Sequence, residues 1–97
     1  MDLVNSKSFS RPLGTSEYVS DCNDALITGK YAFNKSSLHV PVSDSFGLIF
    51  VFSNQTDPSA AYLWTFQFAV VTGQNMSVYY RKKVNATGSW TAWSALN

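Results

Sequence analysis

The feature that most constrains this chain is a short segment that is apolar on both sides. Residues 46–52 read FGLIFVF, and alternate side chains of a strand point to opposite faces. One face would carry Phe46, Leu48, Phe50 and Phe52, and the other Ile49 and Val51. A single antiparallel sheet usually buries one face and leaves the other in water. The segment therefore predicts a sheet whose two faces both need cover.

A second segment strengthens this expectation. Residues 61–71 read AYLWTFQFAVV, with one largely aromatic face: Tyr62, Trp64, Phe66, Phe68 and Val70. The opposite face is mixed: Leu63, Thr65, Gln67 and Ala69. Burial of one large apolar side chain contributes roughly 1.5–3 kcal/mol, so exposure of several would be a serious loss. A helix of at most about ten residues near position 20 cannot cover both faces, and we expect copies of the chain to do so.

The remaining pattern predicts one small antiparallel domain. Strands are expected at residues 26–33 and 76–84, and residues 90–96 close the chain after the turn sequence NATGS. Short strand–turn–strand units in succession are typical of a meander. We therefore predict a mainly β (or small α+β) fold with a single antiparallel sheet and at most one short helix. Residues 15–26 could hold that helix, capped by Ser16, or an irregular turn rich in Asp and Asn. Residues 1–20 are expected to form an extended lead-in or linker from a longer chain, and residues 21–97 the domain itself.

Composition excludes several classes of function. The net charge is +1 and only 13% of the 97 residues are charged, which leaves no electrostatic footprint for nucleic acid. Cys22 and His39 are the only residues of their types, so we expect no intrachain disulfide, no metal and no cofactor. No run approaches the roughly twenty apolar residues of a membrane span, and no signal peptide opens the sequence. Ser, Thr and Asn supply the polar surface instead, which suits neutral, hydroxyl-rich partners.

No catalytic pattern is present either. The sequence contains no Ser–His–Asp order and no phosphate-binding loop. Asp21 and Asp24 are the only close pair of carboxylates. A glycosidase needs two carboxylates that face each other across a cleft, whereas two in one turn are typical of a solvated cap. We predict that the chain is not an enzyme.

The most distinctive chemistry lies in residues 79–97, YYRKKVNATGSWTAWSALN. Tyr79 and Arg81 would share a strand face, and an Arg opposite a Trp across a hairpin can stack on the indole. Trp90 and Trp93 are three apart, which in a regular strand places them on opposite faces. One interpretation is a structural cation–π clamp. The other is a sugar platform, with an exposed indole against a pyranose ring and polar neighbours as hydrogen-bonding groups. The candidate glycan-binding residues are Trp93, Tyr79, Arg81 and Trp90.

Taken together, the segments DCNDALITGKYAF, GLIFVF, WTFQFAV, VYYRKK and GSWTAWSAL resemble the pyocin-knob family of phage tail-fibre and tailocin-fibre domains. The matching positions are Asp21, Asn23, Thr28, Gly29, Tyr31, Gly47, Gln67, Tyr79, Arg81, Trp90, Trp93 and Leu96. The order and spacing of these short motifs carry the resemblance, which covers residues 21–97. The sequence departs from the family pattern at Cys22, where Leu is usual, and at Thr28, where Pro is frequent.

The resemblance implies a homotrimeric, non-enzymatic knob that attaches a virion tail fibre or tailocin fibre to bacterial surface polysaccharide or lipopolysaccharide. The particle would be made in the host cytoplasm and act outside cells, with other fibre domains as neighbours and no insertion into membranes. Two alternatives stay open. One is a purely structural trimerisation knob, and the other is a carbohydrate-binding module appended to an enzyme. Loops would carry specificity in such a domain, so the identity of the glycan does not transfer.

Overall fold

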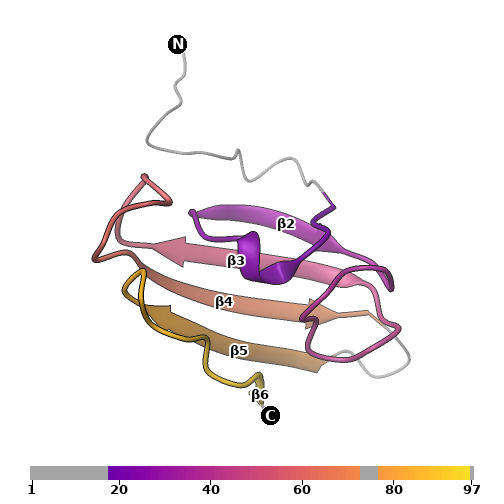
Figure 1. Cartoon of the computed structure of the whole chain (residues 1–97). Coiled ribbons are helices and arrows are strands. Elements are labelled where there is room, and N and C mark those ends of the chain that lie inside the picture. Colours follow the sequence, from indigo (N-terminus) through magenta and orange to yellow (C-terminus); the bar gives the residue numbers. More distant parts are fainter. Residues whose placement is uncertain (1–17, 73–76, 97) are drawn as a thin grey trace.

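The computed structural model describes residues 18–72 and 77–96. They form one antiparallel sheet in which neighbouring strands follow one another along the chain (Figure 1). The strands are β2 (Gly29–Phe33), β3 (Gly47–Ser53), β4 (Trp64–Val71), β5 (Ser77–Val84) and β6 (Ser94–Ala95). The prediction of a mainly β fold with a single antiparallel sheet is confirmed.

Of the two alternatives for residues 15–26, a short helix or an irregular turn, the described residues favour the turn, which contains one 3₁₀ turn, η1 (Cys22–Asp24). Asp21 caps this turn, because its Oδ1 accepts a hydrogen bond from the Asn23 backbone N–H at 2.9 Å. Side chains of Asp and Asn compete with the helical backbone for hydrogen bonds in this way, and they favour turns over helix interiors. Ser16, the cap expected from the sequence, lies outside the described residues.

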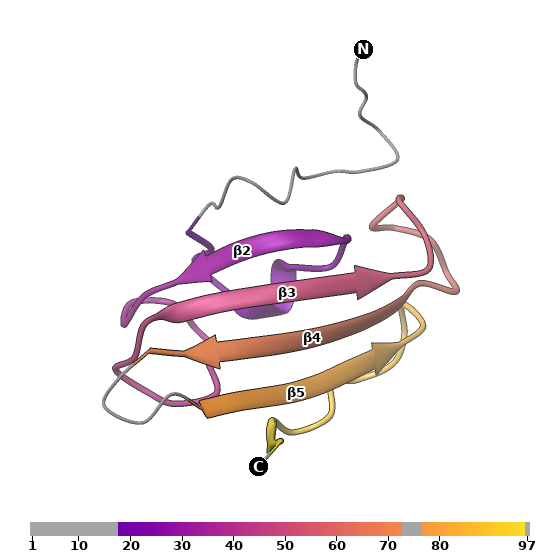
Figure 2. The same cartoon turned by 180° about the vertical axis from the view of Figure 1, so that it is seen from behind.

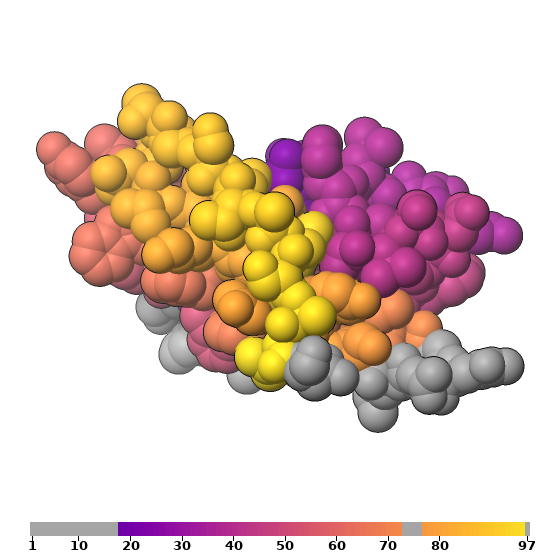
Figure 3. Space-filling view, turned by 90° about the horizontal axis from the view of Figure 1, so that it is seen from below, coloured from indigo at the N-terminus to yellow at the C-terminus, as the bar shows by residue number. Residues whose placement is uncertain are grey.

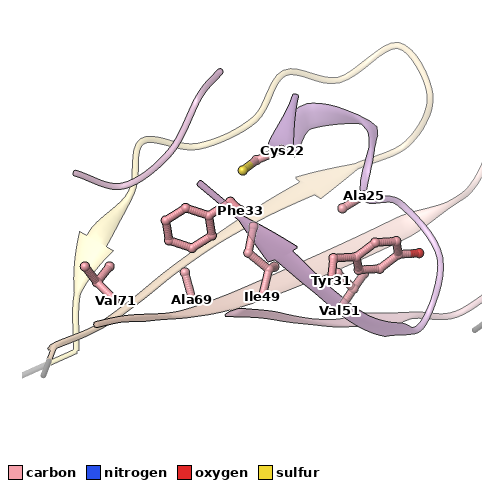
Figure 4. Close-up of a cluster of buried hydrophobic side chains, with 8 residues drawn as sticks. All are labelled: Cys22, Ala25, Tyr31, Phe33, Ile49, Val51, Ala69 and Val71. Carbon is pink, nitrogen blue, oxygen red and sulfur yellow. The ribbon is translucent and has the colours of Figure 1, made fainter. Parts of the chain in front are cut away.

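One face of the sheet carries the hydrophobic core, which lies between the strands and the irregular segment around η1 (Figure 4). The core side chains come from that segment and from β2, β3 and β4: Cys22, Ala25, Tyr31, Phe33, Ile49, Val51, Ala69 and Val71. Phe33 and Ile49 are completely buried. Gly47 makes this packing close, since a Cβ there would lie 2.2 Å from the Val70 carbonyl oxygen. This face of the sheet is covered by residues of the same chain.

The alternation predicted for β3 and β4 is confirmed, but in β4 the mixed face is the buried one. Thr65 and Gln67 are buried, whereas the aromatic row is half-exposed. The covering segment is irregular backbone whose carbonyls need donors once they are buried. Gln67 Nε2 donates to the carbonyls of Cys22 and Ala25 at 2.8 and 2.9 Å, and Thr65 Oγ1 donates to Leu26 at 2.9 Å. Polar side chains therefore face inward because they hydrogen-bond to the cover.

Segments on either side of the sheet occupy its edges. Val19 N–H donates to the Ala32 carbonyl at 2.9 Å beside β2. Residues 90–96 run along β5, where the Thr91 N–H donates to Lys82 and the Leu96 N–H to Val78 at 2.9 and 2.8 Å. Figure 3 views the molecule from below, and there this C-terminal segment passes across the middle of the face that is shown.

Candidate functional site

Arg81 is the centre of the predicted site, and it is buried. It projects from β5 towards the covered face and is 5% exposed. Its Nε donates to Gln67 Oε1 at 2.8 Å. The guanidinium carbon lies 4.1 Å from the Trp90 ring centroid and 4.4 Å from that of Trp93. The stacking of Arg81 on an indole, expected from the sequence, is therefore present, and it involves both tryptophans.

The expectation that Trp90 and Trp93 lie on opposite faces is wrong. Residues 89–93 are not a strand, so the two-residue alternation does not apply to them. The segment instead passes over the covered side of β5, and both half-buried indoles contact the same guanidinium. Trp93 Nε1 also donates to the His39 carbonyl at 2.9 Å. Tyr79, the fourth candidate residue, is half-buried and packs against the hydrophobic core.

A contact that the sequence did not suggest joins η1 to the loop before β3. His39 Nδ1 lies 2.8 Å from Asp21 Oδ1, although the two residues are 18 positions apart. Burial acts to raise the pKa of Asp21, but the Asn23 N–H, the His39 hydrogen bond and the positive charges nearby outweigh it, so the pKa lies below its ordinary 3.8. The pair anchors the backbone that receives the Trp93 indole.

These contacts form a closed circuit through the domain. Asp21 binds His39, whose carbonyl accepts from Trp93; Trp93 stacks on Arg81, which donates to Gln67. Gln67 Nε2 then donates to the carbonyl of Cys22 in η1, next to Asp21. The circuit connects β4, β5 and both covering segments. Its members are therefore occupied with one another, as in the structural clamp considered from the sequence.

Burial also sets the ionisation of the two central groups. It lowers the pKa of Arg81 to about 10, a shift that Cys22 and Asp21 oppose. The guanidinium still carries its charge at neutral pH. Burial raises the pKa of the Cys22 thiol to about 11, so the thiol is protonated and inert at neutral pH.

Among residues 18–72 and 77–96, no three His, Cys, Asp or Glu side chains gather closely enough to hold a metal ion. The same part of the chain contains no helix of the length and hydropathy needed to span a membrane.

The second notable feature is a surface on the other face of the sheet. No segment of residues 18–72 or 77–96 crosses strands β2 to β5 on this side, as the view from behind shows (Figure 2). We define the open aromatic face by its exposed large side chains: Phe52, Trp64, Phe66, Phe68, Tyr80 and Val84. Phe68 and Tyr80 are direct cross-strand partners, and the rings of Phe52 and Phe68 meet edge to face with centroids 5.9 Å apart. The face is thus a continuous apolar surface.

Comparison of the chain with protein-family models, curated proteins and solved structures finds no match. The resemblance to the pyocin-knob family consequently stays a prediction from the sequence motifs. The two distinctive features of the chain are the buried Arg81 circuit and the open aromatic face.

Proposed function

We propose that this chain is a non-enzymatic domain of a phage tail fibre or tailocin fibre. It associates as a homotrimer and serves attachment of the fibre to bacterial surface polysaccharide or lipopolysaccharide. The open aromatic face is the observation that carries the proposal, because a lone protomer exposes a contiguous row of aromatic side chains to water. Surfaces of this kind mark sites of interaction in soluble proteins. A domain that closes one face by itself and leaves the other open is suited to work within an assembly.

A purely structural trimerisation knob is the second candidate, and a specific observation favours it. Trp90 and Trp93 both contact the buried Arg81 guanidinium, which leaves these three side chains less available as a platform for a sugar ring. In this case a neighbouring fibre domain would bind the receptor. If this domain itself binds glycan, Tyr18 and Tyr62, which are 69% and 70% exposed, are aromatic candidates outside the open aromatic face.

Trimerisation would also serve attachment directly. Linked sites bind a repetitive polymer far more tightly than one site does, because each further contact is intramolecular. Three weak sugar sites on one knob would therefore suffice for attachment to a polysaccharide. The alternative of a carbohydrate-binding module on an enzyme needs no such association, and it predicts a monomer.

Two measurements test the proposal. Light scattering at micromolar concentration should give three times the protomer mass of 10.7 kDa, and a monomer would contradict it. Co-sedimentation of the purified protein with polysaccharide and lipopolysaccharide from candidate host bacteria should show binding that Tyr18→Ala or Tyr62→Ala weakens. A trimer that binds none of these glycans would replace attachment with the structural candidate.

A further inference from the structure

We infer that the open aromatic face is the surface through which copies of this chain pack against one another. The inference rests on the proposed association and adds where the contact lies and which side chains make it. The occupant is a second copy of the chain, whose own open aromatic face is apolar in the same way.

The edges of the sheet favour contact through the face. A sheet can associate by adding a strand to a free edge. Here β6 pairs with β5 at Tyr79 and Tyr80, and Thr91 hydrogen-bonds to Lys82 farther along the same edge. At the other edge, Val19 hydrogen-bonds to Ala32 of β2. The C-terminal segment therefore occupies the β5 edge and Val19 part of the β2 edge, while no segment of the described residues covers the face between them.

The area of the face approaches what an interface between copies needs. An aromatic side chain presents about 150–250 Å², and the five aromatic residues of the face are between 36% and 54% exposed. Together they present roughly 300–550 Å² of ring surface. The outward apolar residues Leu48, Phe50, Val70 and Val78 extend this towards the roughly 800 Å² per partner of a standard interface.

The distribution of charge follows the anatomy of an interface. The outward residues of β3 and β4 carry no charge, and the two outward lysines lie on the flanking strands: Lys30 on β2 and Lys82 on β5. An apolar centre with a polar rim is the usual arrangement at protein interfaces. Lysine stems can cover apolar surface while their ammonium groups stay in water. The rim therefore tolerates a second copy that brings lysines of its own.

The chemistry of the face separates a protein partner from a sugar. Three of its residues are phenylalanines, which offer no hydrogen bonds, whereas a sugar site needs polar groups that orient hydroxyls. Interfaces between identical subunits are the more apolar kind, and most soluble oligomers consist of identical chains. A hollow of about 380 Å³ lies beside Phe66, Phe68 and Tyr80, and an aromatic side chain of a second copy can fill it.

The first experiment compares two variants by sedimentation velocity. In Phe66→Thr/Phe68→Thr, threonine keeps the strand preference while it removes two rings from the centre of the face. Loss of each ring should weaken association about tenfold or more. Tyr62→Thr is the matched control, because Tyr62 is an exposed aromatic residue in the loop before β4 and not in a strand, and it should assemble as the wild type does.

The second experiment uses the unaltered chain, so that folding of a variant does not decide the result. Hydroxyl-radical footprinting with mass spectrometry should show Trp64 and Tyr80 oxidised several-fold more slowly in the assembly than in a diluted sample. Oxidation of Tyr62 should be the same in both. This pattern would support the inference even if the double variant failed to fold.

The outcomes separate this inference from the proposed function. If the wild type assembles but Trp64 and Tyr80 remain as reactive as in the diluted sample, another surface makes the contact and only this inference fails. If the wild type is monomeric, both fail. Slow oxidation of Trp64 in that monomer would then indicate that residues 1–17 of the same chain cover the face. Rapid oxidation of Trp64 would indicate that the face binds a different protein.

Discussion

Arg81 Nε donates a hydrogen bond to Gln67 Oε1 at 2.8 Å within the interior of the domain. The pair links adjacent strands at direct register, β4 to β5. Among residues 18–72 and 77–96, Arg81 forms no ion pair with a carboxylate, so the amide oxygen and the indole rings stabilise its charge. The consequences of this arrangement can be measured through single substitutions.

Arg81→Lys should lower the free energy of unfolding by about 2–3 kcal/mol, because lysine lacks the planar guanidinium that reaches Gln67 and stacks on two indoles. Urea unfolding followed by Trp fluorescence measures the change. The matched control is Lys82→Arg on the neighbouring exposed position, which should shift the unfolding free energy by less than about 0.5 kcal/mol. Equal stability of Arg81→Lys and the wild type would contradict a structural role for the guanidinium.

Gln67→Leu should cost about 2–4 kcal/mol of unfolding free energy, although the side chains are similar in size. The substitution leaves the buried carbonyls of Cys22 and Ala25 without the donor that Gln67 supplies, and it leaves Arg81 Nε without its acceptor. Denaturant unfolding gives the value. Gln55→Leu is the control, because Gln55 donates only a longer bond of 3.3 Å in an exposed setting. A gain in stability for Gln67→Leu would mean that apolar packing outweighs these hydrogen bonds.

The domain should lose stability in acid partly through Asp21. Folding lowers the pKa of Asp21 below 3.8, so the unfolded chain binds this proton more readily. The resulting stabilisation is complete above the unfolded pKa and is lost as pH falls through the folded pKa. Unfolding free energies measured between about pH 2 and pH 6 should therefore fall less steeply for Asp21→Asn than for the wild type. Parallel curves would remove Asp21 from the acid response.

Cys22 should react very slowly with a thiol-specific disulfide reagent in the folded protein. Burial excludes the reagent and raises the thiol pKa from 9.0 to about 11, which alone reduces the thiolate fraction about 100-fold near neutral pH. Absorbance of the released thiol follows the reaction. Full reactivity should appear in denaturant, with a midpoint that coincides with global unfolding. Rapid labelling under native conditions would show that η1 opens independently of the sheet.

The strand order and the alternation within β3 and β4 could be predicted from the sequence, because a two-residue apolar period directly determines which side chains share a face. The choice of buried face in β4 could not. Counting apolar residues favours burial of Trp64 and Phe66, whereas burial of Thr65 and Gln67 depends on carbonyls some forty positions earlier. That information lies in the covering segment, and no local pattern in β4 contains it.

The candidate site was predictable in part. An Arg in one strand and Trp residues after the next turn suggested stacking, and the stacking is present. The contact of both indoles with one guanidinium could not be predicted, because it depends on residues 89–93 not forming a regular strand. The Asp21–His39 pair had no signal in the sequence, since a single histidine in a loop has no preferred partner.

The circuit from Asp21 through Trp93 to Gln67 has a consequence for biosynthesis. It takes residues from near the start and near the end of the described chain, so the contacts around Arg81 cannot form while the segment containing Trp90 and Trp93 is still inside the ribosomal exit tunnel. Until that segment emerges, the nascent strands lack the contacts of Arg81 with the two indoles. The domain therefore reaches its native state only after synthesis has passed Trp93. A polypeptide truncated before Trp93 cannot complete the circuit.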